Sequence, residues 1–212
     1  MNKAAPAAIA LSIFALCATA TLDWSSARAE GGAADPAARQ IESFYAVLLQ
    51  TMKQGQQLGI EGRYKKLQPA IEATFDLSTM TKLVVGPSWP TIPAEDQKKL
   101  TTAFERMTIA SYAKNFDGFD GQKFVVQPNV EARNQDRIVQ SELDLSKQAP
   151  VLLIYRMRQA SGPWKIIDVY LGGTVSELAL RRSEFAATIE SGGPAALIKK
   201  LNEAADKLMK EI

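Results

Sequence analysis

The sequence predicts an α+β fold in which helices flank an antiparallel sheet of four strands. Two observations lead to this prediction. Between residues 36 and 116, and again after residue 174, apolar residues recur at spacings of three and four, which indicates amphipathic helices. Between residues 122 and 171 the spacing changes to two, and short turn segments interrupt it, which indicates strands. We expect about six helices in total, packed with the sheet in one domain.

The first helix is expected to begin near Pro36. Its apolar residues share one face: Ile41, Phe44, Tyr45, Leu48, Leu49 and Met52. The segment GQQLG at residues 55–59 is expected to end it, and a second helix is expected over residues 64–73. Asp76 can cap a third helix that runs to about Val85.

The fourth helix, expected from Pro93 to about Phe116, is apolar on two sides. One stripe contains Leu100, Ala103, Phe104, Met107 and Ala110, and a second contains Ile109, Tyr112, Ala113 and Phe116. A single buried face would need only one stripe. Either protein buries this helix on both sides, or one side packs on the core and the other lines an apolar cavity.

Four strands are expected over residues 124–132, 137–145, 151–158 and 164–171. Short connections between the later strands favour an antiparallel meander. The third strand is apolar on both faces, with Val151, Leu153, Tyr155 and Met157 on one and Leu152 and Ile154 on the other. Both faces of such a strand need cover, and a ligand could supply part of it.

Two helices are expected to end the chain. Thr174 and Glu177 have the spacing of a capping box, which indicates the start of the first. The segment SGGP at residues 191–194 is expected to break it, and Pro194 is expected to begin the last helix.

The first 29 residues have the pattern of a signal peptide. Lys3 supplies a short positive region, residues 4–22 are apolar, and Ala27 and Ala29 fit the small residues that a signal peptidase reads. We expect export to the periplasm with cleavage after Ala29. An uncleaved anchor is the alternative, but Pro6 interrupts a run that is shorter than the roughly 20 solidly apolar residues of a membrane span.

Cleavage would remove 29 of the 212 residues and leave 183, without the chain's only cysteine, Cys17. An exported domain without disulfides relies on its hydrophobic core, and 46% hydrophobic residues are enough for one. Residues 30–35 are predicted to be a disordered lead-in, and residues 36–212 a single domain.

The composition excludes several function classes. Histidine is absent, which excludes Ser-His-Asp and Cys-His catalysis and histidine-ligated zinc. A formal net charge of +2 gives no indication of a nucleic-acid partner. The P-loop, GxGxxG and GxSxG motifs are missing from the sequence. We therefore expect no catalytic residues, no metal and no cofactor.

The carboxylates form no convincing pair. Asp117 and Asp120 resemble a calcium loop, but the later acidic ligand of an EF-hand is missing, so we interpret them as turn residues. Asp168 lies within the fourth expected strand. If it is buried it needs partners, and we expect a structural ion pair with Arg156 or Arg158.

Apolar residues are more numerous than a core obviously requires. The candidates for lining a cavity are Val84, Val85, Trp89, Phe104, Met107, Tyr112, Phe116, Leu152, Ile154, Val169 and Tyr170. Ordinary core packing is the alternative for each of them.

Three segments resemble the toluene-tolerance/MlaC family of periplasmic lipid carriers. They are TFDLSTMTKLVVGPSW at residues 74–89, PAEDQKKLTTAFERMTIASYA at residues 93–113 and GPWKIIDVYLGGTVSELALRRSEFAATIESGGPAALIKKL at residues 162–201. The last one carries the family's features at Trp164, Lys165, Asp168, Val169, Val175, Ser176, Arg182, Phe185, Gly192, Gly193, Ala196, Leu197 and Ile198. The ordered set, rather than any single motif, makes the resemblance specific over nearly the whole mature chain.

The resemblance implies a twisted antiparallel sheet related to the NTF2-like group, with helices around a hydrophobic cavity that encloses a lipid. The cavity candidates would then line a lipid pocket. It also implies a monomeric, non-enzymatic shuttle between inner-membrane and outer-membrane transport machinery. Two other hypotheses stay open: an NTF2-like enzyme for a hydrophobic substrate, with Asp168 or Asp117 as base, and an envelope adaptor that carries no lipid.

Leu180 and Arg181 depart from the family's usual Asn-Tyr. This departure resembles the hopanoid-associated HpnM branch, which implies a hopanoid instead of a phospholipid, and an RND-type inner-membrane exporter instead of an ABC-type transporter as the partner. The C-terminal helices also carry basic residues, either as a solvated face or as contacts for lipid headgroups or an acidic partner. They are Arg181, Arg182, Lys199, Lys200, Lys207 and Lys210.

Overall fold

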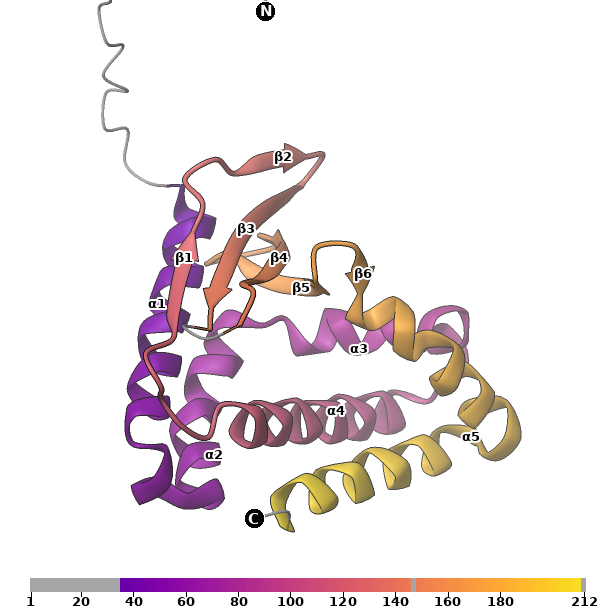
Figure 1. Cartoon of the computed structure of the whole chain (residues 1–212). Helices are drawn as coiled ribbons and strands as arrows, with labels where there is room; N and C mark the ends of the chain where they lie inside the picture. The colour runs from indigo at the N-terminus through magenta and orange to yellow at the C-terminus, as the bar shows by residue number, and fades with distance from the viewer. Residues whose placement is uncertain (1–34, 146–147, 211–212) are drawn as a thin grey trace, which may run out of the picture. The chain divides into compact units, whose positions relative to one another are not determined.

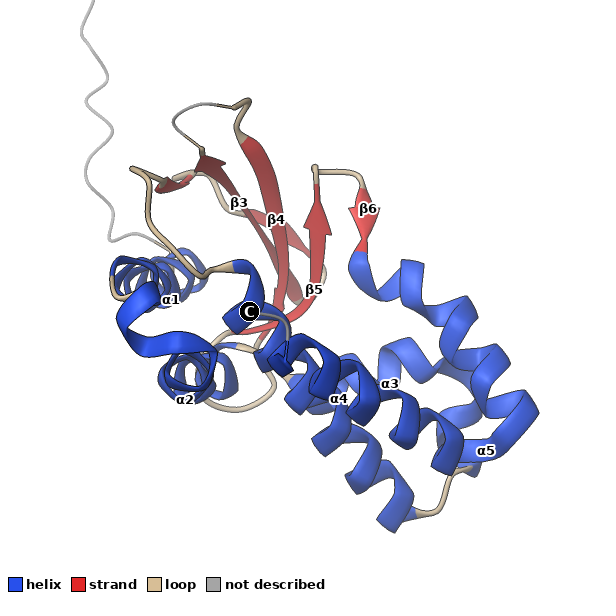
Figure 2. Ribbon diagram, turned by 60° about the horizontal axis from the view of Figure 1, so that its bottom comes forward, coloured by secondary structure: helices blue, strands red, loops and turns tan. Residues whose placement is uncertain are grey.

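The computed structural model describes residues 35–145 and 148–210 (Figure 1). The expected signal peptide, its cleavage site after Ala29 and residues 30–34 lie outside the described part. Within it, helices and an antiparallel sheet confirm the α+β class (Figure 2). No helix among the described residues has both the length and the apolar character needed to cross a membrane.

Helices α1 (Pro36–Lys53) and α2 (Gly55–Thr74) are antiparallel neighbours. The Asp35 carboxylate caps α1 by accepting a hydrogen bond from the backbone N–H of Ala37 at 2.8 Å. The chain turns a corner between α1 and α2, close to the break expected at residues 55–59. Helix α2 is itself kinked at Gly59, whose φ is +58°, and continues beyond it. Gly55 allows the corner to pack closely, since a Cβ atom there would lie only 1.8 Å from the Asp117 carbonyl oxygen.

Helix α3 (Leu77–Val85) begins as expected, because Asp76 accepts a hydrogen bond from the Thr79 N–H at 2.9 Å. The short helix η1 (Gly86–Thr91) leads to α4 (Ala94–Asn115). Both apolar sides of α4 are largely buried, because α2 packs against it on one flank and α5 on another (Figure 1).

The sheet has two more strands than expected. Its strands are β1 (Lys123–Val126), β2 (Glu131–Arg133), β3 (Asp136–Asp144), β4 (Val151–Arg158), β5 (Lys165–Leu171) and β6 (Val175–Ser176). The spatial order is β1-β3-β4-β5-β6, with β2 also paired to β3, and every pairing is antiparallel. The first expected strand is divided around Pro128, which cannot donate a ladder hydrogen bond. The short β6 was not predicted.

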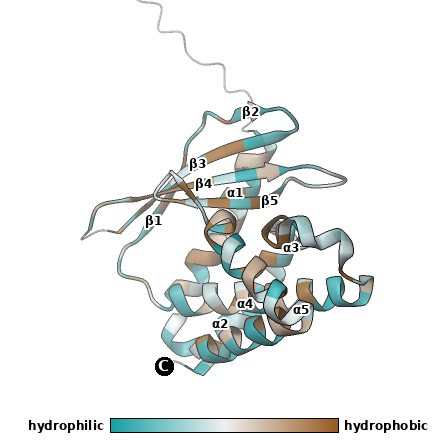
Figure 3. Ribbon diagram, turned by 90° about the vertical axis from the view of Figure 1, so that its right-hand side faces the viewer, coloured by the Kyte–Doolittle hydropathy of each residue, from teal (hydrophilic) through white to brown (hydrophobic). Residues whose placement is uncertain are grey.

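The two faces of the sheet differ in their side chains. The inner face, which packs on the helices, carries Phe124, Val139, Ser141, Leu153, Tyr155 and Val169. The outer face carries Asp136, Leu152, Ile154, Arg156, Asp168 and Tyr170. Figure 3 shows apolar stretches on β3, β4 and β5, and an alternation of hydrophilic and hydrophobic residues along α4 and α5.

Helix α5 (Glu177–Lys210) consists of two helical parts that meet at Gly193, whose φ is +68°. The expected break at residues 191–194 is therefore confirmed, and the second part returns along α4 (Figure 1). The expected cap was wrong by two residues, because Ser176 rather than Thr174 accepts a hydrogen bond from the Ala179 N–H, at 3.0 Å. Thr174 instead belongs to the turn before β6.

Candidate functional site

A mostly apolar cavity of about 300 Å³ lies between the inner face of the sheet and helices α1, α3, α4 and α5. The residues that line it are Leu48, Phe75, Met80, Phe104, Met107, Thr108, Ser111, Tyr112, Asn115, Phe116, Phe124, Leu153, Tyr155, Val169, Leu171, Glu177, Leu178 and Arg181. Its volume falls at the lower end of the range for small-molecule sites.

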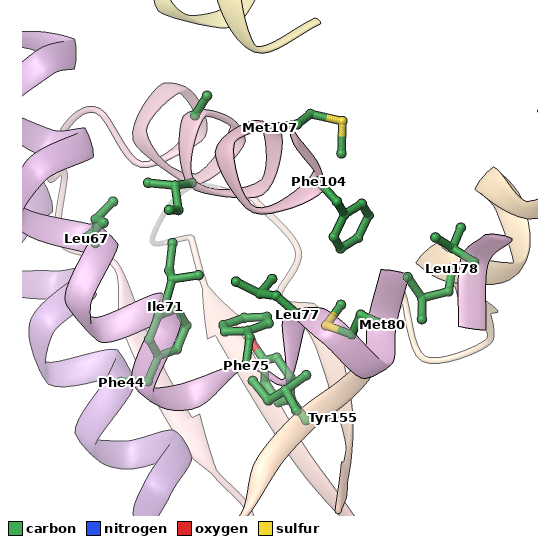
Figure 4. Close-up of a cluster of buried hydrophobic side chains, with 14 of the residues drawn as sticks. Phe44, Leu67, Ile71, Phe75, Leu77, Met80, Phe104, Met107, Tyr155 and Leu178 are labelled. Atoms are coloured by element: carbon green, nitrogen blue, oxygen red, sulfur yellow. The ribbon is translucent and has the colours of Figure 1, made fainter. Parts of the chain in front are cut away.

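The floor of the cavity consists of deeply buried side chains from several elements. Leu48 comes from α1, Met80 from α3, Phe104 from α4 and Tyr155 from β4, and each is no more than 5% exposed. Figure 4 shows Phe104 and Met80 extending from their separate helices toward the same region, with Leu178 of α5 nearby. The floor therefore offers a ligand only hydrocarbon, thioether and aromatic surface, apart from the Tyr155 hydroxyl.

Aromatic rings form one wall and brace it. The Tyr112 ring lies edge-on to Phe44 at 5.6 Å and to Phe75 at 5.7 Å, and it stacks on Phe116 at 5.5 Å. These separations are favourable for aromatic pairs. Because Phe44 is fully buried behind the wall, the lining rings Tyr112 and Phe75 are held in place by packing.

Three hydroxyl groups fix α1 to the sheet behind the cavity. The Tyr45 hydroxyl donates to the Tyr155 hydroxyl at 2.9 Å and lies 2.6 Å from the Ser141 Oγ, which donates to the Leu153 carbonyl at 3.1 Å. Burial raises the pKa of Tyr45 to about 12 and also raises the pKa of Tyr155. These phenols therefore stay neutral near pH 7 and act as hydrogen-bonding groups rather than as acids or bases.

The exposed end of the cavity, which we call the mouth, is polar. Helix α4 contributes Ser111 and Asn115, and the first turns of α5 contribute Glu177 and Arg181. An Arg181 Nη2 atom lies 3.8 Å from a Glu177 Oε2 atom, and both side chains are partly exposed. Leu171, which is 50% exposed, adds an apolar side chain among these polar groups. Polarity thus increases from floor to mouth.

Residues 42–203, about three quarters of the chain, match the MlaC protein family. The chain belongs to the MlaC family. Its fold is similar to that of a phospholipid-binding protein from Ralstonia solanacearum, solved in complex with a phospholipid, with a TM-score of 0.72 and 22% identity over 82% of this chain and 99% of that one. No curated protein sequence matches this chain.

In this MlaC-family structure, five of the candidates for lining the cavity do so. They are Phe104, Met107, Tyr112, Phe116 and Val169. The second apolar stripe of α4 therefore reaches the cavity through Tyr112 and Phe116, while Ile109 and Ala113 of the same stripe are buried in the core.

The other six candidates lie elsewhere. Val84 and Val85 are fully buried in the core, and Trp89 packs against it from η1. Leu152, Ile154 and Tyr170 lie on the outer face, because Leu153 and Tyr155 occupy the cavity side of β4. The Gly172–Gly173 turn covers part of that outer surface, since a Cβ atom on Gly173 would lie 2.5 Å from the Leu152 side chain. A turn, rather than a cavity, therefore accounts for the second apolar side of β4.

Sequence reasoning missed several cavity residues, and three of them had a detectable signal. Leu48 belongs to the apolar face expected for α1, and Leu153 and Tyr155 belong to the other apolar face of β4. Phe75 directly precedes the helix cap at Asp76, and Met80 lies one helical turn after it. Neither carried a periodic signal that pointed to a cavity. Which of two apolar faces turns inward is decided by tertiary packing alone.

The expected ion pair of Asp168 was also wrong. Arg156 Nε and Arg158 Nε each donate to the Asp136 carboxylate at 2.6 Å. Asp168 instead accepts a hydrogen bond from the Ser176 Oγ at 2.7 Å, so it links β5 to the start of α5. Arg156 does lie opposite Asp168 in the pairing of β4 with β5, but the sequence did not indicate that Asp136 would be the closer carboxylate.

Neither carboxylate considered as a catalytic base lines the cavity. Asp168 lies on the outer face, and Asp117 is exposed in the segment after α4. Within residues 35–145 and 148–210, no group of three or more Cys, Asp or Glu side chains is placed to hold a metal ion. The cavity itself offers mainly apolar side chains, with polar and charged groups at its exposed end.

Proposed function

We propose that this MlaC-family protein is a lipid-binding carrier whose cavity encloses the hydrophobic part of one lipid. The observation that supports the proposal best is the gradient from an apolar floor at Leu48, Met80 and Phe104 to a polar mouth at Ser111 and Arg181. An amphiphile that enters tail first matches both ends, because burial of apolar surface provides the main driving force. The fold similarity to a protein solved with a phospholipid supports the same class of ligand.

The lining suits flexible chains of more than one length. Met80 and Met107 face the cavity from α3 and α4, and methionine side chains repack readily around irregular apolar ligands. The braced aromatic wall supplies the rigid side. The carrier proposal therefore covers both phospholipid acyl chains and the ring system of a hopanoid as cargo, and the HpnM branch remains a prediction.

We further propose that the carrier acts in the periplasm after loss of residues 1–29, and that it exchanges lipid with inner-membrane and outer-membrane transport machinery. The inner-membrane partner would be an ABC-type or an RND-type transporter, according to the cargo. The cavity favours this function over an adaptor, for which a solid core would suffice. The positions of Asp117 and Asp168 outside the cavity favour binding over catalysis.

Lipid occupancy tests the proposal directly. The full sequence would be expressed in a Gram-negative host, and the purified product examined by native mass spectrometry and lipid extraction. We expect a bound lipid, or uptake of one lipid per chain when lipid is offered. A protein recovered empty that also takes up no offered lipid would overturn the proposal.

A cavity-filling variant links the lipid to this site. Ser111→Trp puts a large side chain at the mouth, and we expect it to lower lipid occupancy at least about tenfold, because the indole competes for the same space. Thr102→Trp is the matched control, since Thr102 is exposed on the same helix and does not line the cavity. Equal occupancy in the two variants would place the lipid elsewhere.

A further inference from the structure

Two charged residues, Arg181 and Glu177, line the cavity. Arg181 supplies its positive charge. The contact between them spans 3.8 Å, which is longer than a hydrogen bond. It joins residues four apart on an exposed helix surface, where an ion pair contributes little. The Arg181 side chain is 40% exposed and is therefore accessible at the mouth.

Other arginines of the described part are committed to structural partners. Arg182, the next residue, donates to the Leu83 carbonyl at 2.8 Å and ties α5 to α3. Arg156 and Arg158 hold Asp136 at 2.6 Å, and Arg63 donates to the Ala113 carbonyl at 2.7 Å. By contrast, the guanidinium of Arg181 has N–H groups without a hydrogen-bonding partner among the described residues, because its contact with Glu177 spans 3.8 Å.

The opposite side of the mouth adds further polar groups. Ser111 and Asn115 of α4 line the cavity, and the hydrogen bond between their side chains is long, at 3.4 Å. A hydroxyl and a primary amide can each donate to an oxygen atom that arrives between α4 and α5. The mouth thus combines a fork of charged donors on α5 with neutral donors on α4.

We propose that Arg181 is the residue that holds the head of the lipid by binding an oxyanion there, and that this contact makes the carrier select lipids with such a head over neutral ones. The planar guanidinium matches a phosphodiester or a carboxylate with two parallel hydrogen bonds. This inference rests on the proposed carrier function and names the residue that recognises the head of the cargo.

Glu177 has the opposite effect in this arrangement. Its carboxylate competes with the oxyanion for Arg181 and repels it at the same time. Removal of the Glu177 charge is therefore expected to strengthen binding of oxyanion lipids, whereas removal of the Arg181 charge weakens it. Two neighbouring substitutions with opposite signs separate a headgroup site from general damage to the fold.

The test uses the full-length expressed protein and five lipids that differ in the head. Dioleoyl phosphatidylglycerol and dioleoyl phosphatidylcholine carry a phosphodiester, oleate carries a carboxylate, and dioleoylglycerol and a neutral triterpenoid alcohol carry no charge. Affinities would be measured by native mass spectrometry competition for wild type, Arg181→Gln, Glu177→Gln and Lys199→Gln. Lys199 is the matched control, because it pairs with Glu203 at the same 3.8 Å spacing on α5 but does not line the cavity.

We expect Arg181→Gln to weaken oxyanion lipids roughly tenfold, the equivalent of about one charged hydrogen bond, and to leave the neutral lipids unchanged. Glu177→Gln should strengthen the oxyanion lipids, and Lys199→Gln should match wild type. A response restricted to oleate or to the two phospholipids would support the inference and identify the oxyanion as a carboxylate or a phosphodiester.

Two results would overturn the inference and leave the carrier intact. One is equal affinity of wild type for the neutral and the charged lipids. The other is Arg181→Gln behaving like Lys199→Gln while lipid still binds. If wild type binds none of the five lipids, the proposed carrier function itself fails. Thermal melts of all variants should coincide within a few degrees, because these side chains are exposed or partly exposed.

Discussion

The two faces of the sheet use polar groups in opposite ways. On the inner face, Ser141 and Tyr155 join Tyr45 of α1 in a network of neutral hydroxyls within an apolar surrounding. On the outer face, the Asp136 carboxylate is held by two arginines at 2.6 Å. The inner face is closed by helices and the outer face is partly open to water, and charged groups need less compensation where water remains near. We therefore expect different perturbations to destabilise the two faces.

The largest difference is expected from a charge placed on each face of β4. Leu153→Asp buries a carboxylate on the cavity wall and should cost more than about 4 kcal/mol of unfolding free energy, a large part of the total stability. Leu152→Asp places the same charge on the outer face, at a half-buried site, and should cost less than about 2 kcal/mol. Urea denaturation followed by circular dichroism measures both, and equal losses would refute the distinction between the faces.

The outer face should be the acid-sensitive one. Burial would raise the pKa of Asp136, but hydrogen bonds from Arg158 and Arg156 outweigh it and hold the pKa below its ordinary value. A lowered folded-state pKa stabilises the protein above the unfolded pKa of about 4, and this contribution is lost as the pH falls through the folded value.

Asp136→Asn tests that assignment. The substitution should lower the unfolding free energy by about 2–3 kcal/mol at pH 7, since it leaves two arginines without their carboxylate. The difference from wild type should shrink steadily below about pH 4. Glu131→Gln is the control, because the Glu131–Arg133 pair is exposed and contributes little. A difference that does not vary with pH would exclude Asp136 as the titrating group.

The inner face should be the alkali-sensitive one. Tyr45 has a pKa raised from its ordinary 10 to about 12, mainly by burial. A raised pKa means that the stabilisation is complete below about pH 10 and is lost progressively as the pH rises toward 12. Tyr45→Phe should cost about 1–2 kcal/mol near pH 7, because Tyr155 and Ser141 each lose a partner. It should also flatten the decline in stability between pH 10 and 12, as measured by urea titrations across that range. An unchanged slope would contradict this role.

The smallest effect concerns the junction between the sheet and α5. Ser176→Ala removes the cap of α5 and the hydrogen-bond partner of Asp168, and it should cost about 0.5–1 kcal/mol. Thr174→Ala should cost only a few tenths of a kcal/mol, because Thr174 is exposed in the turn. Thermal unfolding distinguishes them, and the reverse order would favour the capping box read from the sequence.

Local sequence signals specified most of the elements. Asp76 marked the start of α3 and Gly193 the corner of α5, because caps and left-handed glycines act through neighbouring atoms. The division of the first strand into β1 and β2 was missed, although Pro128 gave a local reason for it. The two-sided apolar pattern of α4 left open whether this helix serves the core alone or also a cavity, and in the structure both stripes contribute residues to each.

Long-range choices could not be made from the sequence. Leu152 and Leu153 are identical side chains on neighbouring positions, and only the packing of helices on one face and of a glycine turn on the other separates their roles. Arg156 could have paired with Asp136 or Asp168, because both lie on adjacent strands of one face. The missed cavity residues Phe75 and Met80 likewise depend on how α3 meets the sheet.

The sequence by itself determined the α+β class, the order of the elements and the resemblance to the MlaC family, because these depend on periodicity, caps and motifs that follow one another along the chain. The tertiary structure alone decided which apolar face encloses the cavity and which arginine reaches its mouth. Arg181 and Arg182 differ by about 100° around the helix axis, and only the packing of α5 against α3 turns one to the Leu83 carbonyl and the other to the cavity.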